Sequence, residues 1–270
     1  MKHLLTIILF MLLFTNVLSQ VNSEYKSDKI LVSKVLSSFY VNFSFLEEKE
    51  KLYMAYYDSL HQMTLATYDI KNKKLDYQIL PSVIKWDSHN YITMAFDKDG
   101  FLHVSGNMHV EPLVYFRSTV PYDIHSMRSI NLMTGLDEES VTYPSFMKTN
   151  EDELIFHYRT GGSGNGSEIY NIYSTESKTW KRFMDKNLID GEGKRSAYMQ
   201  GPMLGKDGYY HLIWVWRETP DCSTNHTLSY ARSKNLLNWE NISGIETMLP
   251  ITFSKTGFLC RCYSYKRRTV

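Results

Sequence analysis

Residues 208–233 read GYYHLIWVWRETPDCSTNHTLSYARS: an apolar, partly alternating run, a polar turn, and a second run with Tyr. This order is typical of an antiparallel hairpin. Three earlier stretches repeat it, namely KLYMAYYDSLHQMTLATYD (51–69), GFLHVSGNMHVEPLVYFRS (100–118) and DELIFHYRTGGSGNGSEIYNIYS (152–174). The units return at a spacing of about fifty residues, which is in the range of propeller blades.

The four units predict an all-β protein with the architecture of a β-propeller, in which each blade is a four-stranded antiparallel sheet. Asp-Gly turns at Asp99-Gly100 and Asp207-Gly208 precede two of the units. A partial unit at residues 29–46, KILVSKVLSSFYVNFSFL, brings the expected number of blades to about five. No stretch has a convincing helical period over three turns, so we expect no long helix.

The chain opens with MKHLLTIILFMLLFTNVLSQ, in which a basic pair precedes an apolar run and a small-residue site near Val17 and Ser19. These features predict a secretory signal peptide over residues 1–19. A retained anchor is the alternative, and it needs an apolar stretch of about 18 residues or more. No later segment is apolar enough to span a bilayer. We therefore expect a secreted or periplasmic protein without a membrane span.

Composition and charge narrow the class of partner. The chain contains 20 Tyr, 13 Phe and 5 Trp in 270 residues, and these types favour strands. The formal net charge is +1, so no broad field favours nucleic acid. An acidic ligand must therefore be bound by a local cluster of charges. The cysteines form an odd set, Cys222, Cys260 and Cys262, which predicts no disulfide framework.

The blade rhythm stops after residue 253. The predicted organisation is a signal peptide at 1–19, an incomplete propeller at 20–253 and an irregular basic tail at 254–270. The tail carries two of the three cysteines and does not have the pattern of a closing strand. Two explanations stay open, a truncated or frame-shifted C-terminus and a short chain with an irregular charged tail.

Polar and ionisable residues gather beside glycines in a few short segments. In a propeller, the inner strands and their loops line a central channel, so such segments from successive blades can converge. The segments are WDSHNY (86–91), HVSGNMH (103–109), TYPSF (142–146), HYRTGGSGNG (157–166) and WVWRETPDCSTNH (214–226).

Taken in this order, these motifs resemble the bacterial neuraminidase repeat-containing family that includes the seven-bladed ulvan lyases, from about residue 50 to about residue 250. The resemblance implies seven blades, of which about five are present here. It also implies a lyase that cleaves ulvan, a sulfated polysaccharide with uronic acids, by β-elimination. The family's site has two histidines about twenty residues apart and a tyrosine followed by an arginine about sixteen residues later. The matching residues are His89, His109, Tyr143 and Arg159.

The chemistry of elimination explains these residue types. The C5 proton of a uronic acid becomes acidic when the neighbouring carboxylate is neutralised, and a guanidinium such as that of Arg159 grips a carboxylate through two parallel hydrogen bonds. A base and an acid must then reach C5 and O4. We assign Tyr143 and His109 to acid and base, and His89 to neutralisation with Arg159. Tyr143 would be the base if nearby positive charge lowers the pKa of its phenol, and it could also be the acid toward O4. The base and acid roles are exchangeable at this stage.

Further residues are predicted to bind substrate or metal. Asn90 and Asn107 would bind sugar hydroxyls, and Arg217 and Arg232 would bind sulfate or carboxylate groups. We expect no cofactor in catalysis. A structural zinc or calcium ion is expected because the resembling family carries structural metals, with zinc on a thiolate and two imidazoles. The candidate ligands are His211, Cys222 and His226.

The expected function is that of a monomeric polysaccharide lyase whose partner is an acidic sulfated polysaccharide or oligosaccharide. One alternative is an oligosaccharide dehydratase that eliminates water from a terminal uronic acid with the same residues. Another is a propeller that binds glycans without catalysis. A sialidase-like hydrolase is disfavoured, because the sequence has no convincing pair of carboxylates for hydrolysis and no evident aspartate-box repeats.

Overall fold

The computed structural model describes residues 29–37, 41–255 and 258–260, so the predicted signal peptide lies outside the described residues. Chain contacts divide the protein into residues 1–33 and residues 34–270, and every strand named below belongs to the second unit. The described part of the chain contains no α-helix, as expected, and its short 3-10 turns are η1 (Ile124–Ser126), η2 (Cys222–Thr224) and η3 (Phe253–Lys255). None of the described helical segments is long and apolar enough to cross a membrane.

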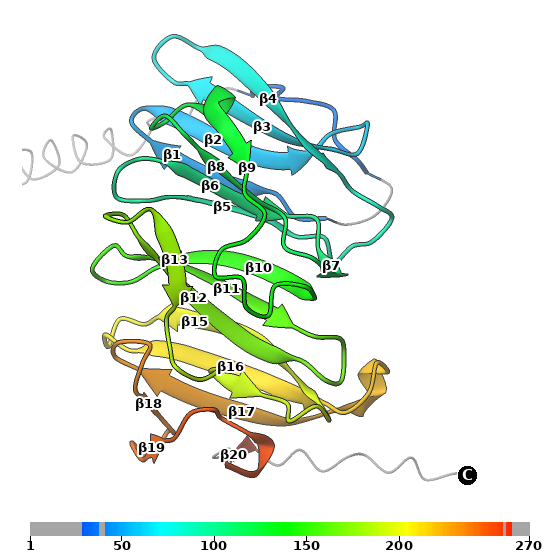
Figure 1. Cartoon of the computed structure of the whole chain (residues 1–270), viewed down its shortest axis with the longest axis vertical. Coiled ribbons are helices and arrows are strands. Elements are labelled where there is room, and N and C mark those ends of the chain that lie inside the picture. The colour runs from blue at the N-terminus through cyan, green and yellow to red at the C-terminus, as the bar shows by residue number, and fades with distance from the viewer. Residues whose placement is uncertain (1–28, 38–40, 256–257, 261–270) are drawn as a thin grey trace, which may run out of the picture. The chain divides into compact units, whose positions relative to one another are not determined.

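In the described residues, twenty strands form four antiparallel sheets, and in each sheet four of them pair in chain order (Figure 1). We call these sheets blades 1 to 4. Blade 1 contains β1 (Ser44–Glu48), β2 (Lys51–Tyr57), β3 (Gln62–Asp69) and β4 (Lys74–Val83); blade 2 contains β5 (Ile92–Phe96), β6 (Leu102–Gly106), β8 (Tyr115–Ser118) and β9 (Met127–Ser129). Blade 3 contains β10 (Val141–Lys148), β11 (Leu154–Thr160), β12 (Ser167–Ser174) and β13 (Thr179–Arg182); blade 4 contains β15 (Ser196–Leu204), β16 (Tyr210–Arg217), β17 (Asn225–Ser233) and β18 (Trp239–Glu240).

The predicted all-β propeller architecture is confirmed. Each of the four repeated sequence units forms the second and third strands of one blade, such as β2 and β3 for residues 51–69. The segment 29–46, predicted as a partial further unit, ends in β1 and so contributes to blade 1. The Asp-Gly turns form as predicted, since Gly100 and Gly208 have φ angles of +83° and +79°, a region that glycine enters without steric cost. The total of about five blades stays a prediction.

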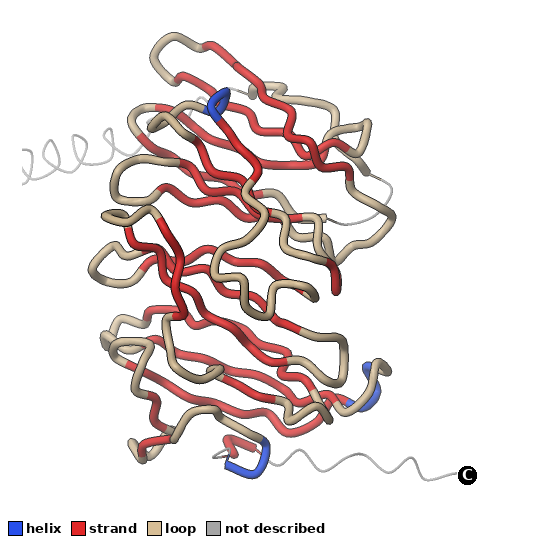
Figure 2. The backbone as a smooth tube through the Cα atoms, viewed as in Figure 1, coloured by secondary structure: helices blue, strands red, loops and turns tan. Residues whose placement is uncertain are grey.

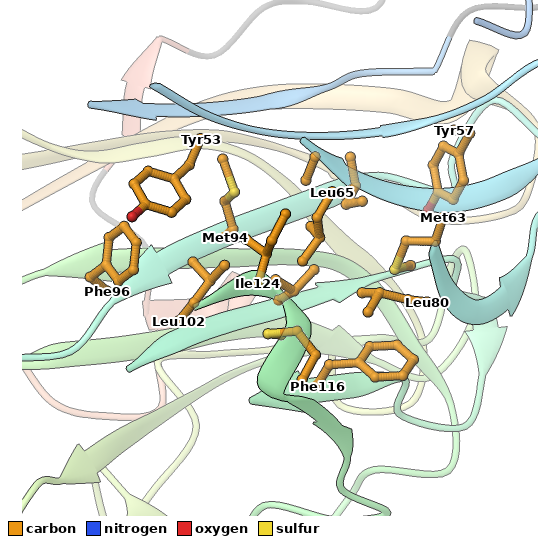
Figure 3. Close-up of a cluster of buried hydrophobic side chains, with 14 of the residues drawn as sticks. Tyr53, Tyr57, Met63, Leu65, Leu80, Met94, Phe96, Leu102, Phe116 and Ile124 are labelled. Carbon is orange, nitrogen blue, oxygen red and sulfur yellow. The ribbon is translucent and has the colours of Figure 1, made fainter. Parts of the chain in front are cut away.

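The hydrophobic core lies between successive blades. Apolar side chains of blade 1, such as Tyr53 and Leu65, pack against Met94, Phe96 and Leu102 of blade 2 in one buried cluster (Figure 3). Tyr53 and Phe96 meet edge to face with their ring centroids 4.8 Å apart, a favoured geometry for aromatic pairs. A four-stranded sheet can bury its faces only against neighbours, so each blade depends on the next.

The same packing repeats further along the chain. One cluster joins blades 2 and 3 through residues such as Tyr115, Phe156 and Trp180. Another joins blades 3 and 4 through Ile155, Trp214 and other residues. In β16, the sequence YHLIWVWR places Tyr210, Leu212, Trp214 and Trp216 on the buried side at every second position, as the two-residue period of a strand requires.

Four short strands extend the blades. They are β7 (His109–Glu111), which pairs with β10, β14 (Ile189–Asp190), which pairs with β12, β19 (Glu246–Thr247), which pairs with β18, and β20 (Phe258–Cys260), which pairs with β17. The last of these departs from the irregular tail expected over residues 254–270. Because β18 pairs with β17 only at Arg232 and Ser233, the edge at Leu228 and Ser229 is left for β20, and unpaired strand edges attract further strands.

The loops of the blades place the candidate residues. In a four-stranded meander, the connection from strand 2 to strand 3 and the connection to the next blade leave from the same end of the sheet. Figure 2 shows the loops of these connections in tan, with η2 in blue and the short strands β7 and β14 in red. The first strands β1, β5 and β10 are neighbours in space. Side chains from β10 and from the loop before β5 can therefore meet.

Candidate functional site

An extra strand brings His109 to blade 3. His109 begins β7, which leaves blade 2 and pairs with β10, with Thr142 opposite His109. The buried Thr142 hydroxyl accepts a hydrogen bond from the Val110 N–H at 2.8 Å. His109 is therefore held beside the strand that carries Tyr143.

His89 and His109 form a stacked pair that shares one carboxylate. His89 lies in the loop between β4 and β5, and its ring stacks on that of His109 with centroids 4.3 Å apart. The Oδ1 atom of Asp87 lies 2.6 Å from Nδ1 of His89, and its Oδ2 atom bonds Nδ1 of His109. Both imidazoles are about one-third to two-fifths exposed, so the pair is open to a ligand.

The carboxyl group of Asp87 is ionised at neutral pH. Partial burial raises its pKa, but the His89 N–H and the imidazoles of His109 and His89 all donate to it and lower the pKa to about 2. Hydrogen bonds to the charged form of a carboxylate favour that form. Asp87 therefore supplies one negative charge and two acceptor oxygens between the histidines.

Tyr143 occupies an irregular position in β10. The register of β10 against β11 shifts between Thr142 and Ser145, and Tyr143 has a φ angle of +58°. Non-glycine residues rarely adopt this region, and those that do cluster at functional sites. A bulge of this kind re-aims a side chain. The Tyr143 ring lies 6.0 Å from the ring of His89 and 5.4 Å from that of Tyr91.

The environment of Tyr143 distinguishes its two possible roles. As a base, Tyr143 would need nearby positive charge to lower the pKa of its phenol. Burial instead raises the pKa of Tyr143 above its ordinary value, and the opposing effects of Arg159 and Arg217 are smaller. Desolvation opposes the phenolate because it disfavours a charged group. The phenol is thus a proton donor at neutral pH.

Arg159 is a buried cation without an acceptor. It lies in β11, is 1% exposed, and none of its three guanidinium nitrogens has a hydrogen-bond partner in the described residues. Its guanidinium carbon lies 4.9 Å from the ring centroid of Tyr143 and 5.6 Å from that of Tyr198. Buried charges are normally paired because an unpaired one is costly. The arrangement is suited to an anionic ligand that supplies the missing acceptors.

A glycine clears space for the Arg159 side chain. A Cβ atom on Gly166 would lie 2.7 Å from Cδ of Arg159 and 2.9 Å from its Cγ, which is too close for any pair of carbon atoms. The absence of a side chain at Gly166 therefore leaves room for the Arg159 side chain.

We therefore expect Gly166→Ala to displace Arg159 and lower kcat/KM by about 10²-fold, since small misplacements of a reacting group have effects of this size. Steady-state kinetics on ulvan, the substrate that the family resemblance implies, measures the change. Gly193→Ala is the control, because a Cβ at residue 193 meets nothing within 4 Å. Since Gly193 has a φ of +65°, this control should lose stability without losing activity. Equal activity of both variants would contradict the role given to Gly166.

A cleft borders the tyrosines of this group, and its lining does not include His89, His109 or Arg159. It has a volume of about 640 Å³, and Tyr91, Tyr143 and Tyr198 contribute to its lining. Its wall also contains His157 and Glu168, whose Nε2 and Oε2 atoms are 2.7 Å apart. The volume is typical of sites that bind small molecules or sugar units.

Two of the predicted substrate-binding residues have hydrogen bonds within the protein, Asn107 through its side chain and Asn90 through its backbone. The Asn107 side-chain amide donates to Ser82 Oγ at 2.8 Å and to the Val83 carbonyl at 3.1 Å, and so ties blade 2 to the end of β4. Asn90 is buried, and its N–H donates to the Asp87 carbonyl at 3.4 Å. These asparagines support the histidine loops in this structure.

The two predicted arginines lie in different places. Arg217 belongs to the site, since its guanidinium carbon lies 3.6 Å from the ring centroid of Tyr198. Arg232 lies in β17 opposite His211 and pairs with Glu240, with Nε and Oε1 2.7 Å apart. The structure therefore brings Arg217 toward Tyr143 and Arg159, and does not bring Arg232 there.

The predicted zinc ligands are not brought together. In the ladder of β16 and β17, His211 lies opposite Arg232, whereas His226 lies opposite Trp216. Five residues of strand separate the two positions, about 16 Å at the usual rise. Each imidazole already has a carboxylate partner, Asp207 for His211 and Glu218 for His226. This correction removes His211, Cys222 and His226 as a common metal site.

One other group could hold a metal by its donor types. Among the described residues, Asp87, His89 and His109 place a carboxylate and two imidazole nitrogens within 4.8 Å of one another. Zinc binds such donors. The donors are nevertheless satisfied without an ion, because each carboxylate oxygen already bonds one Nδ1 atom. The geometry fits direct hydrogen bonds, and no step below involves a metal.

Sequence reasoning missed three residues of this site. Asp87 lies two positions before His89, inside the quoted motif, and its proximity to a histidine was the available signal. Tyr91 ends the same motif. Tyr198 gave no motif signal, and only the structure places it against Arg159 and Arg217.

Comparison with known proteins places these residues in a family context. The model of the BNR repeat-containing family matches residues 51–268. The ulvan lyase short isoform of Alteromonas sp. (strain LOR) is 27% identical over 139 residues, which are 48% of this chain and 26% of that protein. The ulvan lyase long isoform of Glaciecola sp. (strain KUL10) is 38% identical over 61 residues, 23% of this chain and 6% of that protein. The matched segments are thus about a quarter or less of these relatives' length.

Solved structures support the fold. The crystal structure of the polysaccharide lyase Uly1 superposes with a TM-score of 0.70 at 18% identity and covers 90% of this chain and 64% of that one. A PL25 ulvan lyase bound to -[GlcA(1-4)Rha3S]- gives a TM-score of 0.63 at 16% identity, over 81% of this chain and 58% of that one. At these identities the likeness concerns the fold.

Proposed function

This chain belongs to the BNR repeat-containing family, and from that premise we propose that it is a polysaccharide lyase that cleaves ulvan or a related uronic-acid polymer by β-elimination. Its matched relatives are ulvan lyases, although the matches cover only part of their length. The site, rather than the likeness alone, is the basis for assigning the chemistry.

The unpaired Arg159 carries the proposal. A buried guanidinium with no acceptor in the described part of the chain is suited to bind the carboxylate of a uronic acid in a bidentate manner. Neutralising that carboxylate makes the C5 proton acidic, which is the step that elimination requires. A hydrolase does not remove the C5 proton and so does not need this neutralisation, whereas a lyase does.

The groups around Arg159 are suited to transfer the protons. The C5–H bond and the C4–O4 bond break, a C4–C5 double bond forms, and O4 leaves with a proton. The raised pKa of Tyr143 favours this phenol as the acid that protonates O4. His109, with its Nε2 atom free of contacts to Asp87, is then suited to take the C5 proton, and His89 supports the same step.

Substrate binding requires a local movement. The guanidinium nitrogens of Arg159 are inaccessible, and the rings of Tyr143 and Tyr198 lie against them. A carboxylate can reach Arg159 only when a covering side chain moves. Tyr198 borders the cleft and is held by a hydrogen bond between its hydroxyl and Ser163 Oγ, 2.7 Å apart. One broken hydrogen bond is a small cost compared with a new charged pair.

The proposed substrate is an acidic sulfated polysaccharide. One structural neighbour is bound to a disaccharide repeat of glucuronic acid and sulfated rhamnose. In this chain, Arg217 beside Tyr198 provides a second cation for a sulfate or carboxylate next to the uronate. The reaction needs no cofactor, and the proposed site of action is outside the cell or in the periplasm.

Incubation of the protein with ulvan and with ulvan oligosaccharides tests the proposal. We expect the ultraviolet absorbance of unsaturated uronates to rise while the polymer shortens. A rise with no change in chain length would instead identify a dehydratase that acts on a terminal uronic acid. Retained binding without any rise would identify a glycan-binding propeller.

A further inference from the structure

We propose that Asp87 is a positioning residue that holds His89 and His109 in one tautomer, so that both Nε2 atoms face the substrate. Its effect on rate rests on the proposed function. The tautomers themselves are a property of the protein alone, and they can be measured without any substrate.

The hydrogen-bond geometry fixes the tautomers. Each oxygen of the Asp87 carboxylate contacts Nδ1 of a different histidine, Oδ1 that of His89 at 2.6 Å and Oδ2 that of His109. An ionised carboxylate only accepts hydrogen bonds, and Asp87 is ionised at neutral pH. Both Nδ1 atoms must therefore carry hydrogen, and the lone pair of each neutral imidazole lies on Nε2.

The loop that carries Asp87 holds its side chain in place. The Asp87 N–H donates to the Lys85 carbonyl at 2.9 Å, and the His89 N–H donates to Asp87 Oδ1 at 2.8 Å. The Asp87 carbonyl accepts from the N–H of the buried Asn90. His89 is thereby held by its own loop. His109 lies at the start of β7, 22 residues along the chain from Asp87, and is held by the Asp87 side chain.

This arrangement explains why two histidines lie in contact at one site. Without a shared acceptor, each imidazole could adopt either tautomer. In half of the combinations, Nε2 of His109 would carry hydrogen and would direct an N–H at C5 instead of a lone pair. A base requires the lone pair. Asp87 removes the unproductive combinations, as the carboxylate that orients a catalytic histidine does in other enzymes.

Asp87→Asn gives a sharp test, because the amide offers one acceptor oxygen and one donor nitrogen. Only one histidine can still donate from Nδ1, and the other must accept at Nδ1 and carry its hydrogen on Nε2. Nitrogen NMR of the imidazoles, assigned with His89→Gln and His109→Gln, should show two Nδ1–H rings in the wild type and one switched ring in the variant. We expect kcat on ulvan to fall about 10²-fold, with KM within a few-fold.

Asp76→Asn is the matched control. Asp76 bonds His125 with Oδ2 and Nε2 2.8 Å apart at a half-exposed position outside the site. This variant should keep both kcat and the tautomers of His89 and His109.

The outcomes separate the two proposals. The predicted NMR pattern without lyase activity supports the role of Asp87 and contradicts the proposed function. A wild-type ring with hydrogen on Nε2, or an Asp87→Asn variant with both tautomers unchanged, overturns the role of Asp87. Stoichiometric zinc binding by the wild-type protein, with loss of both Nδ1–H signals, also overturns it and identifies a metal site.

Discussion

Arg159→Met should lower kcat/KM on ulvan by about 10³-fold or more, because the uronate carboxylate would lose the one buried guanidinium among the described residues. The same variant should be slightly more stable than the wild type. An unsatisfied buried group costs about 1–3 kcal/mol and a charged one more, and Met fills much of the same space. Ring contacts with Tyr143 and Tyr198 would be lost, so we expect a net gain of about 1 kcal/mol in the free energy of unfolding.

Arg182→Met is the control for this prediction. Arg182 lies in the same blade but is paired, with Nη1 2.9 Å from Asn171 Oδ1 and Nη2 2.5 Å from Asp137 Oδ2. Its loss should reduce the free energy of unfolding and leave kcat/KM within a few-fold. Thermal denaturation and steady-state kinetics of both variants provide the comparison. An Arg159→Met variant that is destabilised and fully active would show that the arginine is a structural residue.

Tyr143→Phe should lower kcat by about 10²–10⁴-fold and change KM little, because it removes the proton donor for O4 and keeps the ring. The burial that raises the pKa of Tyr143 keeps the phenol protonated, so the group is a donor across the neutral range. Ultraviolet kinetics on ulvan at saturating substrate measures kcat directly.

Tyr170→Phe is the matched control for Tyr143. Tyr170 is a buried tyrosine of the same blade whose hydroxyl has no hydrogen-bond partner in the described residues. Removal of that hydroxyl should leave kcat unchanged and should not destabilise the protein. If Tyr143→Phe behaves like Tyr170→Phe, Tyr143 is not the acid.

The fold could be predicted because its signals are local. Each hairpin is encoded by an alternating run, a polar turn and a second run, and the two-residue period of β16 predicts which of its side chains are buried. The pairing of β7 with β10 and of β20 with β17 could not be predicted. Those pairs join segments far apart in sequence, and their short strands carry no periodic pattern.

The site could be predicted in part for a similar reason. His89, His109, Tyr143 and Arg159 lie in motifs whose spacing resembles that of a family. The structure places the His89 ring 4.3 Å from that of His109 and 6.0 Å from that of Tyr143, with Arg159 against the Tyr143 ring. The direction of the Tyr143 pKa shift could not be predicted, because it depends on burial that only the fold determines. The zinc set failed because His211 and His226 lie near opposite ends of the ladder of β16 and β17, while Cys222 lies in the turn between these strands.

The most direct test of the central claim is mass spectrometry of the products that the protein releases from ulvan in oxygen-labelled water. Elimination forms the new double bond without adding water, whereas hydrolysis places a solvent oxygen in the product. We predict products with an unsaturated uronate at the new end, one water lighter than hydrolytic products and free of the label. Saturated products that carry solvent oxygen, or bound ulvan that is left intact, would contradict the proposed lyase.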